Sequence, residues 1–353
     1  MSTVPPIFVN GRFLTQPMTG VQRVASEMTA ALRTRYGGRL SILGPARGMA
    51  PDMANATSVG HNTGQFWEQI DLPRHARNGI LLNLGNTAPL AHRRQLVMIH
   101  DAGIFATPEA YSAKFRAWYR LLQGVLGRNG TEIVTVSEFS KAELIRNLSL
   151  QAARVHVVRP GTDHMARLSA DEAILTRYGL QPDGFVLVVG TLAAHKNLAS
   201  LNVLAEALVA RGIPFAITGA AGGAAFSDKG PICLPASALY LGRVTDAQLK
   251  ALYENAACFI MPSLYEGFGL PAVEAMICGC PVVAADIPAL RETCGNAALF
   301  CNPRAPENIA QVTLALLDDA PSRAKMREAA LNHSTEMTWQ KSADSLANII
   351  AGL

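Results

Sequence analysis

Residues 262–286, PSLYEGFGLPAVEAMICGCPVVAAD, combine a glycine turn, a helix and a buried strand. Gly267 and Gly269 lie in the turn, and Pro271 is well suited to be a first helical residue. Residues 272–278 are good helix formers and stop before a glycine. The PVVAAD that follows has the pattern of a buried strand. We therefore predict a loop, a helix and a strand in this order.

This turn has the properties of a binding site for a phosphorylated, hydroxyl-rich ligand. A glycine turn that leads into a helix leaves backbone N–H groups free at the positive end of the helix dipole, where a diphosphate can bind. Two carboxylates bracket the turn, Glu266 before it and Glu274 on the first turn of the helix. An ionised carboxylate only accepts hydrogen bonds, so we expect both to bind hydroxyls of a sugar or a ribose.

The spacing of Glu266 and Glu274, with seven residues between them that include GFGLP, resembles the signature of retaining glycosyltransferase family 4. The resemblance implies the GT-B fold, in which two Rossmann-like α/β domains face each other across a cleft. It further implies that Glu274 binds the ribose of a nucleotide and that Glu266 contacts the donor sugar. The amides that would hold the diphosphate belong to Gly267, Phe268, Gly269 and Leu270. The alternative is an ordinary strand, turn and helix with solvated glutamates.

The length and composition fit two soluble domains. A chain of 353 residues is too long for one core. From the resemblance we expect an acceptor-binding domain over residues 1–168 and a nucleotide-sugar-binding domain over 169–337, with a last helix, about 338–353, that returns to the first domain. The N-terminus lacks the features of a signal peptide, and no run approaches the ~18 apolar residues of a membrane span. We expect a cytoplasmic protein, either free or peripheral on the inner membrane.

Cysteines and charge are unevenly distributed. All six cysteines lie in the second half without the spacing of a zinc site, so we expect buried free thiols rather than disulfides. Residues 1–168 carry 19 Lys and Arg against 10 Asp and Glu, and the remainder carries 12 against 17. The basic first half suggests an anionic partner, such as a lipid surface or a diphosphate-bearing acceptor, and we expect no nucleic-acid partner. An unevenly charged solvated surface is the alternative.

Two positions of the first half are candidates for the donor site. Gly20 lies where a polar loop becomes the helix predicted over residues 21–36. His100 ends the strand pattern LVMIH, and parallel sheets bind ligands beyond the carboxyl ends of their strands. The resemblance implies that Gly20 faces the donor phosphates and that His100 lies beside the donor sugar. A plain strand–helix turn and a capping or core histidine are the alternatives.

The helix predicted over residues 111–128 has a second possible role. Phe115, Trp118 and Leu122 share one face, and Arg116 and Arg120 lie opposite. Packing against the sheet is one interpretation, and contact with a membrane surface is the other.

The second half opens with a buried strand, a glycine turn and a helix. Gly190 and Thr191 follow the strand, and the turn continues to His195 and Lys196. Lys196 resembles the family's phosphate-binding lysine, whose charge offsets the diphosphate as the glycosidic bond breaks. Relatives carry an arginine before this lysine or after the strand glycine, and His195 and Thr191 replace it here.

A later loop, LGRVTD, resembles the segment that receives the nucleotide base. The resemblance implies base contacts at Arg243 and Val244.

The resemblance implies a metal-independent retaining glycosyltransferase without a cofactor, because the chain has no Asp-x-Asp motif for a divalent ion. The N-terminal run, the WEQ at 67–69 and the NLGNTAP and IHDA segments resemble bacterial exopolysaccharide and O-antigen mannosyltransferases. GDP-mannose is the implied donor, and a polyprenyl-diphosphate-linked or oligosaccharide acceptor is the implied partner. A catalytically weak scaffold protein of the same fold is one alternative. A phosphorylase or epimerase of this fold is another.

Overall fold

The computed structural model describes residues 5–47, 56–220 and 234–353, and the chain divides into two compact units. Unit 1 comprises residues 1–102, 116–161 and 338–353, and unit 2 comprises 103–115 and 162–337. Unit 2 therefore begins at Thr162, before the division predicted at 168/169, and also includes a short segment from the first half. Each unit is an α/β structure, as predicted.

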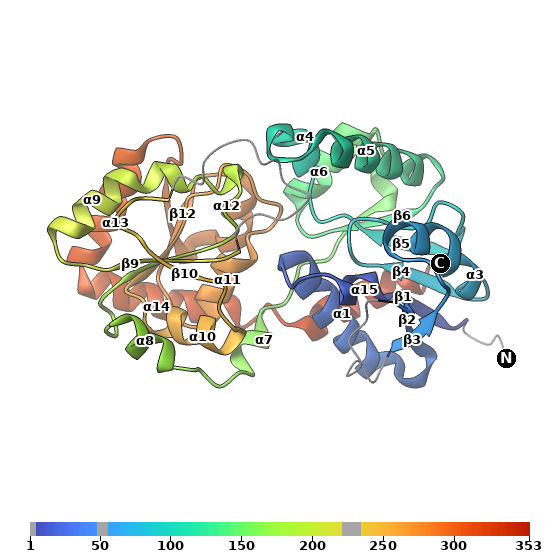
Figure 1. Ribbon diagram of the computed structural model, residues 1–353, viewed down its shortest axis with the longest axis horizontal. Coiled ribbons are helices and arrows are strands. Elements are labelled where there is room, and N and C mark those ends of the chain that lie inside the picture. Colours follow the sequence, from blue (N-terminus) through green and yellow to red (C-terminus); the bar gives the residue numbers. More distant parts are fainter. Residues whose placement is uncertain (1–4, 48–55, 221–233) are drawn as a thin grey trace. The chain divides into compact units, whose positions relative to one another are not determined.

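Unit 1 is built on a seven-stranded parallel sheet with the order β3-β2-β1-β4-β5-β6-β7 (Figure 1). Its strands β1, β4 and β5 are buried apolar runs, as parallel strands covered on both faces require. The chain moves from β1 to β3 in one direction and from β4 to β7 in the other, so β1 and β4 flank the point where the order reverses. The strands span Ile7–Asn10, Leu40–Pro45, Ala56–Val59, Ile80–Asn83, Gln95–Met98, Glu132–Thr135 and Val155–Val157.

The helices of unit 1 include the last helix of the chain. α15 (Trp339–Ile350) packs beside α1 (Gly20–Tyr36), and the Arg35 guanidinium pairs with the Asp344 carboxylate at 2.7 Å. The Ser342 hydroxyl donates to the Arg159 carbonyl at 2.5 Å. The prediction that the last helix returns to the first unit is confirmed. The remaining helical segments of unit 1 are η1 (Gly11–Thr15), η2 (Gly37–Arg39), α2 (Gly64–Phe66), η3 (Trp67–Asp71), α3 (Leu72–His75), α5 (Ala113–Arg128), α6 (Glu138–Leu148) and η5 (Ala152–Arg154), of which α5 begins in unit 2.

Three local details of unit 1 separate the sequence pattern from the structure. The Pro-, Gly- and Asn-rich sequence that extends to about Gln65 favours a loop, but it contains β3, whose exposed edge position leaves no apolar pattern to detect. Residues 48–55 of this stretch lie outside the described residues. Of the two serines that the sequence offers as the cap of this helix, Ser137 and Ser140, Ser137 is the N-cap of α6, and its hydroxyl accepts from the Ser140 amide at 3.0 Å. A capping box of Ser140 with Glu143 therefore does not form. The helix predicted from residue 111 begins at Ala113.

Unit 2 is built on a six-stranded parallel sheet with the order β10-β9-β8-β11-β12-β13 (Figure 1). The chain runs from β8 to β10 in one direction and from β11 to β13 in the other. Because parallel crossovers are right-handed, this reversal puts the connecting helices on opposite faces of the sheet. The strands span Val186–Val189, Phe215–Thr218, Leu239–Gly242, Cys258–Met261, Val282–Ala285 and Ala298–Cys301.

The core of unit 2 lies between this sheet and its helices. One cluster joins Val186, Val188 and Ile260 of the sheet to Leu204 and Leu208 of α9, with all five side chains buried. The helical segments of unit 2 are α4 (Gly103–Ala106), η4 (Pro108–Ala110), α7 (Asp163–Ala166), α8 (Ala173–Tyr178), η6 (Ala194–Lys196), η7 (Leu198–Leu201), α9 (Asn202–Ala210), α10 (Asp246–Asn255), α11 (Leu270–Ile277), α12 (Pro288–Cys294), η8 (Gly295–Ala297), α13 (Pro306–Asp318) and α14 (Ala320–Ser334).

The cysteines in the described part of unit 2 are free thiols, as predicted. Cys258, Cys280, Cys294 and Cys301 are buried, and Cys278 is half-buried; Cys233 lies outside the described residues. Burial raises the pKa of the Cys258 and Cys294 thiols to about 12, so these thiols are unreactive at neutral pH.

Two features are absent from residues 5–47, 56–220 and 234–353. No group of three or more His, Cys, Asp or Glu side chains there is arranged to hold a metal ion. No helix in the same ranges is both long and apolar enough to cross a membrane.

Candidate active site

The loops after β8 and β11 of unit 2 are joined by hydrogen bonds. The two strands are neighbours in the sheet, so their carboxyl ends lie at the same edge. The Leu264 amide donates to the His195 carbonyl at 2.8 Å, and the Asn197 side chain donates to the Pro262 carbonyl at 3.0 Å. Asn197 adopts a left-handed conformation with φ of 60°, which asparagine tolerates better than most residues. These bonds hold the two predicted donor loops together.

Lys196 and Glu266 form an ion pair between these two loops. The Lys196 ammonium donates to Glu266 Oε1 at 2.7 Å, and the side chains are 17% and 11% exposed. A partly buried charge is costly without a partner, and here each group supplies the other's countercharge. The ammonium has three donors, so donors beyond the one used by Glu266 can bind a phosphate. The structure thus brings together two residues that the sequence predicts to act on the same ligand.

A second set of contacts ties the glycine turn after β8 to the loop after β10. The Gly190 amide donates to the Thr218 carbonyl at 3.0 Å, and the Gly219 amide donates to the Gly242 carbonyl at 2.9 Å. A Cβ at Gly219 would collide with the Gly190 carbonyl, and its φ of +151° also favours glycine. The loop after β10 continues directly into the predicted base-contact residues.

The other predicted residues of these two loops are accessible. Thr191 and His195 are half-buried, as is Val244, and Arg243 is exposed. All four therefore have some surface available to a ligand.

The N-terminus of α11 forms as predicted from its glycines and proline. Gly269 is the N-cap residue with φ of +90°, and a Cβ there would collide with the Leu290 side chain. Pro271 lies in the first turn, where its missing N–H removes no helical hydrogen bond. Phe268 and Leu270 are buried and fix the turn in the core. Gly269, as the N-cap residue, has no side chain to cap this end of the helix, so the positive end of the helix dipole can attract an anion.

Glu274 lies deeper in α11 than predicted. The helix begins at Leu270 and has no acidic residue in its first turn, so Glu274 belongs to the second. Its side chain is largely buried, and Oε1 lies 3.0 Å from His164 Nε2. His164 follows the point where the chain enters unit 2, and it is itself 4% exposed. The carboxylate therefore has a fixed orientation, and its other acceptor positions can still bind hydroxyls.

A buried tyrosine adjoins the same carboxylate. The Tyr253 hydroxyl has no hydrogen-bond partner of ordinary geometry among the described residues. Burial, and then the negative charge of Glu274, raise the pKa of Tyr253 well above its usual value. The phenol is therefore neutral.

The remaining predicted site residues, Gly20 and His100, belong to unit 1. Gly20 is the first residue of α1, and a Cβ there would meet no atom within 4 Å. His100 is 7% exposed, and its Nε2 lies 3.0 Å from the Leu84 carbonyl, so Nε2 carries the proton. Burial lowers the pKa of His100, which keeps the ring neutral with its lone pair on Nδ1. The Asn86 side chain accepts from the His100 amide at 2.8 Å and fixes this position.

Two residues of the site were not identified from the sequence. His164 partners Glu274 and Asn197 joins the loops, but each depends on residues far away in the chain. Asparagine before a helical segment was a detectable turn signal. The sequence around His164, GTDH at residues 161–164, contains no signal that this histidine is the partner of a glutamate on a helix.

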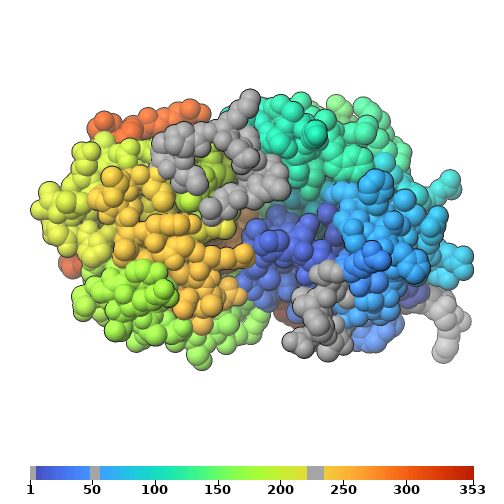
Figure 2. All heavy atoms as spheres, viewed as in Figure 1, coloured from blue at the N-terminus to red at the C-terminus, as the bar shows by residue number. Residues whose placement is uncertain are grey.

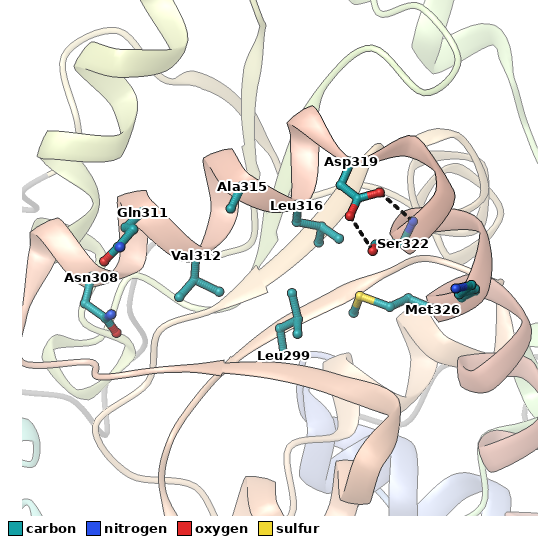
Figure 3. A pocket seen from close by; sticks show the side chains of 10 residues that line it. Leu299, Asn308, Gln311, Val312, Ala315, Leu316, Asp319, Ser322 and Met326 are labelled. Atoms are coloured by element: carbon teal, nitrogen blue, oxygen red, sulfur yellow. Dashed lines mark hydrogen bonds between the residues drawn. The ribbon is translucent and has the colours of Figure 1, made fainter.

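A groove of about 560 Å³ lies elsewhere in unit 2, along α13 and α14 (Figure 3). Leu299, Val312 and Met326 form its apolar floor, and Asp319 accepts two hydrogen bonds from Ser322 at one end. None of its lining residues is a predicted site residue, so the groove is separate from the loops after β8 and β11.

Comparison with known proteins identifies the family. Residues 177–333 match the model of the group 1 glycosyl transferases. O-antigen chain mannosyltransferase B of Escherichia coli is 31% identical over 312 residues, which are 84% of this chain and 80% of that protein. The D-inositol 3-phosphate glycosyltransferase 1 of Catenulispora acidiphila is 29% identical over 58% of this chain and 53% of its own.

Solved structures share the fold over the whole chain. Sucrose-phosphate synthase from Thermosynechococcus elongatus superposes with a TM-score of 0.74 at 14% identity, over 99% of this chain and 98% of its own. WaaG, a glycosyltransferase involved in lipopolysaccharide biosynthesis, has a TM-score of 0.71 at 15% identity, over 98% and 100%. The expected resemblance to glycosyltransferases with the GT-B fold is confirmed. The chain belongs to the group 1 glycosyl transferases.

Proposed function

We propose that this glycosyltransferase is a retaining mannosyltransferase that moves mannose from GDP-mannose to a polyprenyl-diphosphate-linked saccharide in bacterial surface polysaccharide synthesis. The Lys196–Glu266 ion pair carries the proposal, because it sets a cation for phosphate beside an acceptor for sugar hydroxyls. The similarity to O-antigen chain mannosyltransferase B supports mannose and a role in surface polysaccharide synthesis. Anabaena HepE, which shares the fold at 17% identity, was solved with UDP-glucose, which supports a nucleotide-sugar donor in general.

The proposed reaction uses protein groups without a cofactor or metal ion. Lys196 and the amides of residues 267–270 stabilise the charge that develops on the diphosphate as its bond to the sugar C1 breaks. An acceptor hydroxyl forms the new bond to C1 on the face that the nucleotide leaves, and its proton passes to the departing diphosphate. Glu266 orients the donor sugar, and Glu274, fixed by His164, binds the ribose.

Other predicted residues complete the donor site in this proposal. Arg243 and Val244 contact the base, and His100 accepts a hydrogen bond from the donor sugar at Nδ1. The backbone around Gly20, Gly190 and Thr191 contacts the donor, as does the His195 segment. Because His195 replaces an arginine, Lys196 is the main cation in unit 2 for the leaving group.

The acceptor part of the proposal depends on the similarity to O-antigen chain mannosyltransferase B. Inositol phosphate glycosyltransferases also match, over a smaller share of the chain, and their names imply a different acceptor.

A lipid-linked acceptor also implies that the protein acts at the cytoplasmic face of the inner membrane. In α5, Leu122 and Leu126 are buried, whereas Arg120 and Leu121 are exposed and could contact anionic lipid. Unchanged vesicle binding by an Arg116→Gln/Arg120→Gln variant would leave α5 as packing alone.

The first test is a thermal-shift panel of GDP, UDP, ADP and their sugar conjugates with and without EDTA. A ligand that binds the folded state at about 100 times its Kd adds about 2.7 kcal/mol of stability. We expect shifts with GDP and GDP-mannose that EDTA does not change. A shift with another nucleotide changes the donor, and no shift with any of them supports the scaffold alternative.

Substitutions then test the residue roles. Lys196→Met should lower kcat by about 100-fold or more, as expected for loss of one transition-state donor. Glu274→Ala should weaken nucleotide binding, whereas Glu266→Ala should mainly slow transfer. Arg211→Gln is the control, because it breaks the exposed Arg211–Asp318 pair in the same unit. Equal nucleotide affinity in wild type and Glu274→Ala would remove the ribose assignment.

A further inference from the structure

Unit 1 contains a buried polar cluster at the carboxyl ends of β1 and β4. Asn10 ends β1, Arg12 lies in the η1 segment that follows, and Thr87 lies in the loop after β4. Glu68 joins them from η3, a π-helical segment between α2 and α3. π-Helical turns are rare and occur often at functional sites. In Figure 2 the dark blue atoms of the first part of the chain lie beside the lighter blue atoms of residues about 60–90 on the surface of unit 1.

The Glu68 carboxylate is unevenly satisfied. Oε2 accepts hydrogen bonds from Arg12 Nε at 2.6 Å, from the Thr87 hydroxyl at 3.0 Å and from the Asn10 side-chain Nδ2 at 3.2 Å. Oε1 accepts no hydrogen bond from any residue in the described part of the chain, although the side chain is only 1% exposed. An unpaired oxygen on a buried carboxylate is costly, because the group accepts hydrogen bonds only. Among the described residues, the cluster therefore supplies no hydrogen-bond donor to Oε1.

Arg12 is the accessible member of the cluster. Its side chain is 12% exposed, and its Nη2 donates to the Thr87 hydroxyl at 2.7 Å. Burial raises the pKa of Tyr119, whose hydroxyl adjoins the Arg12 guanidinium. Arg12 and Glu68 cancel each other's charge, so the cluster offers a donor and an acceptor at little net charge. A hydroxyl group can satisfy both, because it donates and accepts.

The position of the cluster points to a ligand. β1 and β4 flank the place where the strand order of unit 1 reverses, and ligands of open α/β sheets bind beyond the carboxyl ends of the strands at this place. In unit 2 the equivalent place lies between β8 and β11, where Lys196 and Glu266 meet. Both units therefore gather polar and charged side chains at the same topological position.

We propose that the Arg12–Glu68–Thr87 cluster is an acceptor subsite, where Arg12 donates to hydroxyls of a saccharide and Glu68 accepts from them. This inference rests on the proposed function and adds the residues that select the acceptor. Because the Glu68 carboxylate already neutralises the Arg12 guanidinium, the cluster favours neutral hydroxyls as ligands. The same carboxylate would repel a diphosphate. Asn10 at the end of β1 and Thr87 in the loop after β4 hold the carboxylate in place.

Two conservative variants test the subsite in the full-length protein. Arg12→Lys keeps the positive charge but loses the planar guanidinium with its paired N–H donors. Glu68→Gln keeps the shape of the side chain but loses its negative charge. Each should raise the KM for the acceptor by about 10- to 100-fold, the effect of a lost hydrogen bond to a charged group. The GDP-induced thermal shift should stay at the wild-type value. Thr87→Val provides a third variant if Glu68→Gln does not fold.

Two acceptors distinguish recognition of the saccharide hydroxyls from recognition of a diphosphate. One saccharide is offered on a neutral alkyl chain and on a polyprenyl diphosphate. An equal loss with both acceptors supports hydroxyl recognition, whereas a loss confined to the diphosphate acceptor overturns it. Glu143→Gln is the matched control, because Glu143 pairs with Arg146 at 2.7 Å on the surface of α6 in the same unit. The control should keep the wild-type KM.

A binding measurement separates this inference from the proposed function. Saturation-transfer NMR detects the free saccharide on wild type and on Arg12→Lys without any turnover. Binding that wild type shows and Arg12→Lys loses supports the subsite, even if no donor supports transfer. If wild type transfers mannose and all three variants keep its acceptor KM, the subsite is wrong and the proposed function stands.

Discussion

At the scale of single residues, each main hydrogen bond or ion pair of the candidate site fixes the orientation or the proton position of one side chain. Lys196 is held beside Glu266, and both side chains keep some exposure. Glu274 is held by His164 and is less exposed. His100 is held by the Leu84 carbonyl, which leaves its Nδ1 as an acceptor. The partners thus determine the orientation and the proton position of residues that the sequence could only name.

The first prediction concerns His164 as a positioning residue. His164→Ala leaves the Glu274 carboxylate without its partner in a largely buried position, which should cost about 1–3 kcal/mol of folding free energy. It should also weaken GDP binding, because the carboxylate loses its fixed orientation. Urea unfolding and GDP titration measure the two effects. His164→Gln should restore part of the GDP affinity, because it can still donate. A variant that loses stability but keeps wild-type GDP affinity would limit His164 to a structural role.

The second prediction concerns His100 and pH. Burial lowers its folded-state pKa, so below the ordinary pKa of about 6.5 the unfolded chain binds a proton that the folded protein does not. The stabilisation is fully present above pH 6.5 and is lost as the pH falls toward the folded-state pKa. Urea midpoints at pH 7.5 and 5.5 should therefore differ less for His100→Gln than for wild type. The same substitution at the exposed His61 is the control. An equal pH dependence in wild type and His100→Gln would contradict the prediction.

At the scale of elements, parallel strands bring the site together because their carboxyl ends share one edge of each sheet. The loops after β8 and β11 meet through Asn197 and Leu264, although these residues lie far apart in the chain. The glycine turns allow this close approach. Gly219 packs on Gly190, and Gly269 packs on Leu290, where any side chain would collide.

The third prediction separates collision from backbone strain in the α11 turn. Gly269→Ala adds a Cβ that meets Leu290 at a φ of +90°, and it should cost more than the ~1–3 kcal/mol of a strained residue alone. Gly212→Ala is the matched control in unit 2, because its φ is +65° and its Cβ would meet no atom within 4 Å. Urea unfolding of the two variants measures the difference. Equal destabilisation would show that the contact with Leu290 relaxes freely.

The sequence predicted the elements of this site better than its contacts. Apolar runs and glycine signals identified the strands β8 and β11 and the helix α11, because these signals are local. The pairing of Glu274 with His164 could not be predicted, since it joins residues 110 positions apart in the chain. The exposed edge strand β3 was also missed, because it buries no alternate residues. Lys196 and Glu266 were predicted to share a ligand, but not to form an ion pair.

At the scale of the whole molecule, each unit has its own parallel sheet and its own buried core. The proposed nucleotide contacts of Lys196, Glu274 and the α11 turn all belong to unit 2. The proposed acceptor cluster of Arg12 and Glu68 belongs to unit 1. In these proposals Gly20 and His100 of unit 1 also contact the donor, so Glu274 is the position to alter for nucleotide recognition and Arg12 or Glu68 the position to alter for acceptor recognition.

The last prediction uses the distribution of tryptophan between the units. The three tryptophans of the chain, Trp67, Trp118 and Trp339, all belong to unit 1, and Trp67 and Trp339 are buried. Tryptophan fluorescence therefore reports the unfolding of unit 1, whereas far-UV circular dichroism reports both units. Because domains with separate cores can unfold separately, GDP should raise the transition of unit 2 in circular dichroism and shift the fluorescence midpoint much less. Glu274→Ala should remove the shift in circular dichroism and leave the fluorescence midpoint unchanged. Coincident transitions that GDP moves by the same amount would mean that the two units unfold as one cooperative structure.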